Sequence, residues 1–80
     1  MAKYDPLGDH LKADGSPLIT LSFAAIARLV DGLPASASDY RCWWSNQRGN
    51  SRYVQARAWR EVGYLAEPDM MNQLVLFRKS

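Results

Sequence analysis

A chain of 80 residues with a single cysteine, Cys42, must hold its fold together without an internal disulfide. Its core therefore has to come from packed side chains, and 48% of the residues are hydrophobic, including three Trp, four Tyr and two Phe. Large aromatic side chains bury much apolar area each, so a few of them can build the core of a short chain. This composition predicts one folded domain over residues 1–80 rather than a disordered chain.

Basic and acidic residues are segregated along the chain, although the net charge is only +2. The segment from Arg41 to Arg60 contains five arginines and no Asp or Glu, so it carries +5. The rest of the chain holds five basic and eight acidic residues and carries −3. Because local charge sets the field that a partner meets, an anionic partner is expected at this segment.

Three elements are predicted in the first half of the chain. A strong break at residues 14–17 (DGSP) ends a helix that is predicted over residues 6–13. The apolar, β-branched run at residues 18–21 predicts a short strand. From Phe23 onward, apolar side chains recur at i, i+3, i+4 and i+7, which predicts a helix over residues 23–31 with one buried face.

In the second half, a short helix is predicted over residues 38–45 and a longer helix over residues 51–62. Two strands are predicted at residues 64–66 and 73–77, and the turn between them is predicted to start at residues 67–69. The order helix-strand-helix-helix-helix-strand-strand predicts an α+β fold, a small winged-helix-like domain. One departure is that about 20 residues separate the second and fourth helices, whereas a helix-turn-helix uses a turn of a few residues. Either the short helix fills this gap, or the fold is a different α+β arrangement.

The helix predicted over residues 51–62 has two unlike faces at about 100° per residue. Its apolar residues are expected to face the core, namely Val54, Ala58, Trp59 and Val62. The opposite face carries Tyr53, Arg57 and Arg60, with the small Ala56 between them to allow close approach of the backbone. This face suits the major groove of duplex DNA, where arginine pairs with guanine or binds phosphate. An ordinary solvated helix face is the alternative.

The segment before that helix is the most unusual local feature, because Trp43 and Trp44 are adjacent and a polar run follows them. Adjacent side chains on a helix cannot point the same way, so one Trp could stack on a base, although two core residues are favoured. Asn and Gln pair with adenine edges, so the polar run is either a reader of bases or a plain loop. The full set of candidate nucleic-acid-binding residues is Arg41, Asn46, Gln47, Arg48, Arg52, Tyr53, Arg57 and Arg60.

Short motifs spread over nearly the whole chain resemble a family of small bacterial domains that has no established function. They include YDPL at residues 4–7, and the most specific is the double Trp followed by Asn in RxWWxN at residues 41–46. The resemblance implies a single folded domain in a bacterial or phage cytoplasm, and it implies no mechanism. At a looser level, residues 51–66 resemble the recognition helix and first wing strand of winged helix-turn-helix DNA-binding domains, in which a basic helix ends at Gly and enters the hairpin.

The expected function is binding of nucleic acid, principally double-stranded DNA, with sequence or structure specificity, in a transcriptional or phage-type regulator. The alternative is a protein-interaction module, such as an antitoxin, inhibitor or accessory factor, that presents the same Arg/Trp surface to an acidic protein partner. A homodimer is also open, with the last strand and the first helix as candidate surfaces, because Leu74 and Leu76 leave apolar surface that something must cover.

Catalysis is not expected from this chain. His10 is the single histidine and Cys42 the single thiol, and nothing in the sequence brings them together, so an enzyme that uses Cys42 is the weakest hypothesis. One His and one Cys cannot fill a usual zinc site, and there is no glycine-rich phosphate loop, so neither metal nor cofactor is predicted. No signal-peptide pattern and no apolar run of membrane-spanning length occur, so a cytoplasmic protein is expected.

Overall fold

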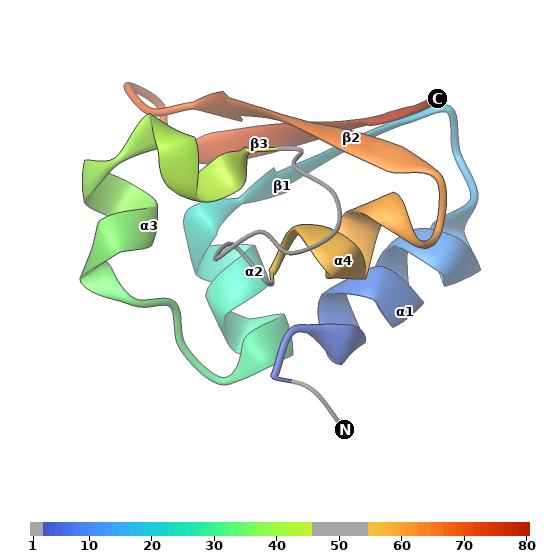
Figure 1. Cartoon of the computed structure of the whole chain (residues 1–80), viewed down its shortest axis with the longest axis horizontal. Helices are drawn as coiled ribbons and strands as arrows, with labels where there is room; N and C mark the ends of the chain where they lie inside the picture. The colour runs from blue at the N-terminus through green and yellow to red at the C-terminus, as the bar shows by residue number, and fades with distance from the viewer. Residues whose placement is uncertain (1–2, 46–54) are drawn as a thin grey trace.

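The computed structural model describes residues 3–45 and 55–80. Its elements follow in the order α1 (Asp5–Asp14), β1 (Leu18–Ser22), α2 (Phe23–Val30), α3 (Ala35–Asp39), the 3₁₀ helix η1 (Arg41–Trp44), α4 (Ala56–Arg60), β2 (Tyr64–Asp69) and β3 (Leu74–Lys79). This is the predicted α+β fold, with the winged-helix-like order of its elements confirmed (Figure 1).

The strands form one antiparallel sheet in the order β1-β3-β2. Phe77 of the central strand pairs with Ile19 of β1 on one side and with Ala66 of β2 on the other. The early strand β1 therefore completes a three-stranded sheet with the hairpin. The helices α1, α2 and α4 all lie on one side of this sheet (Figure 1).

Local signals set the limits of the first two helices. Pro6 lies in the first turn of α1, where a missing N–H costs nothing, and the helix ends at Gly15 with a left-handed φ of 69°. The Ser22 hydroxyl caps α2 by accepting a hydrogen bond from the Ala25 N–H at 3.0 Å. The three elements predicted before residue 31 are confirmed within one or two residues at each end.

A run of aromatic rings joins the helices to the sheet. The ring of Trp44 stacks on Phe23 at 5.3 Å and on Trp59 at 5.9 Å between centroids. Trp59 in turn contacts Phe77 of the central strand at 5.8 Å. Trp43 packs edge-on against Trp44 at 4.6 Å, and both are buried. The favoured prediction that both tryptophans belong to the core is confirmed, and the idea of an exposed Trp is wrong.

The single short helix predicted over residues 38–45 is wrong. The chain forms α3 and then η1, and the break lies at Tyr40, whose φ of −126° and ψ of 119° are extended. This break turns the two segments so that the Trp44 indole N–H donates a hydrogen bond back to the Ala37 carbonyl at 2.8 Å. With η1 turned in this way, the Trp44 ring lies between Phe23 and Trp59 in the core.

The turn predicted to start at residues 67–69 is also wrong, because β2 continues to Asp69 and the turn occupies residues 70–73. Pro68 is compatible with the strand because β2 is at the edge of the sheet. Its carbonyl faces away from β3 and accepts a hydrogen bond from the Arg41 side chain. The backbone nitrogen of a strand residue points to the same side as its carbonyl, so the sheet loses no hydrogen bond.

Candidate nucleic-acid interface

The short helix α4 lies directly before the β2–β3 hairpin and is held tightly against α1. Trp59 is fully buried under it, and Ala58 packs beside the backbone of Gly8. A Cβ atom added at Gly8 would lie 2.5 Å from the Ala58 carbonyl oxygen, so only glycine allows this approach of the two helices. The position of α4 in the fold is thus fixed by close packing.

The start of α4 is buried, which corrects the predicted division of its faces. Gln55 is buried, and its side-chain amide donates a hydrogen bond to the Trp43 carbonyl at 2.6 Å. Ala56 is also buried, so its predicted place between the arginines on an open face is wrong. The prediction assumed one narrow buried stripe, but α4 packs on both α1 and β2 and meets η1 through Gln55. The helix also ends at Arg60 rather than at the predicted residue 62.

Arg57 and Arg60 remain on the outward side of α4. The Arg57 side chain is 77% exposed, and Arg60 is half-buried. The guanidinium of Arg57 donates through Nε and NH2 to Oε1 of Glu61, at 3.1 and 3.0 Å. Glu61 is the first acidic residue after the acid-free segment from Arg41 to Arg60, and it lies four residues after Arg57, which is the spacing of an ion pair on a helix.

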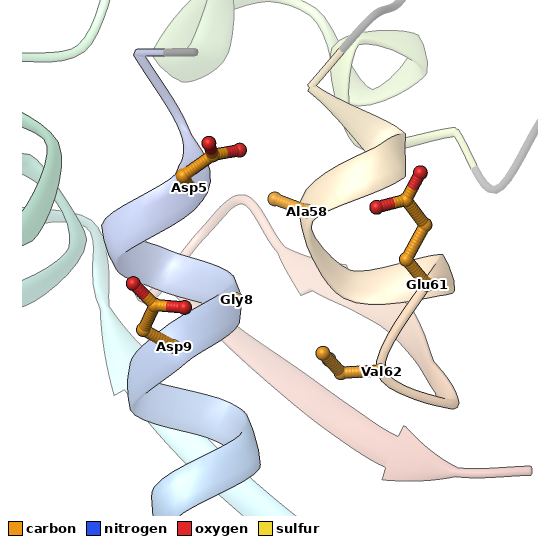
Figure 2. Close-up of a pocket in the computed structure, with 6 residues that line it drawn as sticks. All are labelled: Asp5, Gly8, Asp9, Ala58, Glu61 and Val62. Atoms are coloured by element: carbon orange, nitrogen blue, oxygen red, sulfur yellow. The ribbon is translucent and has the colours of Figure 1, made fainter. Parts of the chain in front are cut away.

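An acidic cavity of about 270 Å³ lies between α1 and α4, lined by Asp5, Gly8, Asp9, Ala58, Glu61 and Val62. Figure 2 shows carboxylates from both helices at its border. Negative charge repels phosphate, so this side of α4 disfavours a nucleic acid. The sequence did not indicate this cavity, because the approach of α1 to α4 is a contact between distant parts of the chain.

Arg41 belongs to a different part of the molecule. Its guanidinium donates to the Pro68 carbonyl at 2.8 Å, so η1 is attached to the edge of β2. A hollow of about 490 Å³ lies between these elements, lined by Arg41, Cys42, Trp44, Ser45, Ala66 and Pro68. In Figure 1, η1 lies near the β2–β3 turn, whereas α4 lies toward the other end of the sheet. The described candidate residues therefore divide into two places.

The remaining predicted site residues, Asn46, Gln47, Arg48, Arg52 and Tyr53, lie outside the described residues.

The turn of the β2–β3 hairpin, residues 70–73, has the position of a wing but carries no basic side chain. Its conformation is fixed by Asn72, whose side-chain and backbone N–H groups donate to the Asp69 carboxylate at 2.9 and 3.1 Å. These hydrogen bonds hold the pKa of Asp69 below its ordinary value. This turn therefore offers no positive charge to a phosphate.

One family model covers nearly the whole chain: that of a domain of unknown function, DUF7662, matches residues 4–80. No curated protein matches the chain, and no solved structure does. Across residues 3–45 and 55–80, no helix has the length and apolar character needed to cross a membrane.

Proposed function

The chain belongs to the DUF7662 family, a domain of unknown function, and we propose that it binds nucleic acid, principally duplex DNA, through the outward side of α4. The observation that carries this proposal is the position of Arg57 and Arg60 on a helix that directly precedes an antiparallel hairpin in a winged-helix-like sheet. A helix in this position suits the major groove of duplex DNA. A protein that binds DNA in this way would serve as a regulator of transcription.

The charges around α4 favour one direction of approach. The acidic cavity excludes phosphates from the side that faces α1, whereas Arg57 is open to solvent. A nucleic acid is therefore expected to meet α4 on the side of Arg57. In the sequence, Arg48 and Arg52 add two more positive charges shortly before this helix. The chemistry favours an anion because arginine binds phosphate through paired N–H groups.

The ion pair between Arg57 and Glu61 does not prevent this role. Both side chains are mostly exposed, and an exposed i, i+4 pair contributes only about 0.3–0.5 kcal/mol. A DNA phosphate offers Arg57 a stronger charge-assisted hydrogen bond in exchange. The Arg57–Glu61 ion pair therefore lowers the affinity for DNA slightly but does not prevent binding.

The test is a fluorescence anisotropy titration of a labelled, random-sequence duplex of about two helical turns at several salt concentrations. If about four arginines neutralise phosphates, log affinity should fall with log salt with a slope near −3.6. Absence of binding at low salt, or binding that does not respond to salt, would contradict the proposal. Selection from a random duplex library then identifies the preferred bases.

A protein-interaction module remains the second candidate, in a narrower form. The buried tryptophans cannot meet a partner, but Tyr40 is 62% exposed and lies next to Arg41 and the hollow between η1 and β2. Tyr and Arg are common hot-spot residues in interfaces. A pull-down with the intact chain that recovers one acidic protein in stoichiometric amount would favour this candidate, provided that the Tyr40→Ala variant loses this protein. The chain should then also show no affinity for DNA.

A further inference from the structure

The side of the sheet that faces away from the helices, here called the outer sheet face, carries an apolar patch. Inward positions of the three strands are filled by core residues such as Ile19, Val75 and Phe77. The alternate positions point outward, and leucines of all three strands occupy them: Leu18, Leu65, Leu74 and Leu76. No element in the described part of the chain lies on this side (Figure 1).

Exposure of these leucines is unusual for an outer sheet position. Leu18 is 51% exposed, and Leu65, Leu74 and Leu76 are only partly buried. Antiparallel sheets with one free face normally alternate apolar inward residues with polar outward ones. A leucine cluster on the free face therefore indicates a surface that is covered by a partner.

The charges on the outer sheet face suit a second copy of the same chain. Arg78 lies between Leu18 and Leu65 in the sheet register, and Glu67 lies beside Leu76. Their side chains meet on this face, with Arg78 Nε 2.7 Å from Glu67 Oε2, and both remain largely exposed. A two-fold interface joins identical patches, so it requires a patch that is complementary to itself. One acid and one base beside a leucine cluster satisfy that requirement.

The register also indicates how two copies would meet. A two-fold axis that runs diagonally across the face, through Leu65 and Leu76, exchanges the positions of Glu67 and Arg78. Each leucine on the axis then meets its own copy, and Arg78 of one protomer meets the partner's Glu67. Strands about 4.8 Å apart with about 3.4 Å per residue place this axis about 35° from the strand direction, so the strands of the two sheets cross at about 70°. This angle is closer to the orthogonal than to the aligned way of packing sheets.

We infer that the chain forms a homodimer through the outer sheet face. With strands about 4.8 Å apart and about 3.4 Å per residue, the face measures roughly 15 by 20 Å. This is small beside the roughly 800 Å² per partner of a standard interface, so the dimer is expected to depend on concentration in the micromolar range or above. The dimer leaves α4 uncovered, because α4 lies on the other side of the sheet. Dimerisation and nucleic-acid binding are therefore independent.

Sedimentation of the intact chain over a range of concentrations tests the dimer, together with two charge variants. Glu67→Arg alone and Arg78→Glu alone should each weaken self-association at least about tenfold, since like charges then meet across the axis. An equimolar mixture of the two variants should recover association. In the mixed dimer, position 67 of each chain meets position 78 of the other, and opposite charges face each other at both contacts. Both positions are exposed, so the variants should fold, and circular dichroism of each variant checks this.

Leu76→Asp provides a second variant that should abolish the dimer without a change in the sheet interior. A wild-type chain that stays monomeric at every concentration would overturn the proposal. Charge variants that dimerise as the wild type does, or a mixture that fails to associate, would overturn it as well.

Discussion

Gly8 is the residue on which the placement of α4 depends most directly. Its missing side chain lets α1 approach the backbone of Ala58, where a Cβ atom would meet a carbonyl oxygen at 2.5 Å. The sequence shows only a glycine inside a predicted helix, which is unfavourable on local grounds by about 1 kcal/mol relative to alanine. The reason for it is a contact with a helix some 50 residues further along the chain, which no local pattern contains.

Gly8→Ala should therefore lower the free energy of unfolding, by about 1–3 kcal/mol, although alanine is the better helix former. The obstructing atom belongs to the backbone, so the two helices must move apart. Urea denaturation measures the effect, with Lys12→Ala on the exposed side of the same helix as the control. A Gly8→Ala variant that is as stable as the wild type would show that α1 and α4 are less tightly packed than described.

At the scale of elements, the first half of the chain was predictable and the second half only in part. The helix at α1, the strand at β1 and the helix at α2 follow from caps, breaks and periodicity that lie within each segment. The split of residues 35–44 into α3 and η1 was not predictable, because it serves the burial of two tryptophans against distant elements. The passage of β2 through Pro68 depends on its place at the sheet edge, which the sequence does not reveal.

The candidate site was predictable to a similar extent. A pattern of 100° per residue correctly turns Arg57 outward and Trp59 inward. It fails for Ala56, because tertiary contacts from more than one side bury a wider face than a single stripe. It also leaves out the acidic cavity, whose carboxylates come from α1 and from Glu61, which directly follows α4 and lies about 50 residues further along the chain.

The ion pair on α4 leads to a prediction at this scale. Glu61→Gln removes a negative charge beside Arg57 and releases its guanidinium, so affinity for duplex DNA should rise roughly threefold or more at low salt. Glu67→Gln is the matched control, since Glu67 is also an exposed, ion-paired glutamate but lies on the outer sheet face. Equal gains from both substitutions would mean that only net charge matters, and that α4 has no special part in binding.

For the whole molecule, the fold converts a segregation of charge along the chain into a segregation between faces. The acidic residues of α1 flank one side of α4, whereas Arg57 opens to solvent on its outward side. The outer sheet face lies on the opposite side of the sheet, away from both. The molecule thus separates a surface suited to an anionic partner from a surface suited to a second copy of itself.

The most direct measurement for the central proposal compares two double variants in the duplex anisotropy titration. Arg57→Ala with Arg60→Ala removes two positive charges from α4, and Lys12→Ala with Arg28→Ala removes two exposed charges from α1 and α2. Both variants should fold, because neither pair belongs to the core. The α4 variant should lose at least about tenfold in affinity and flatten the salt slope, while the control changes far less. Equal losses in the two variants, or undiminished binding by the α4 variant, would contradict the proposal.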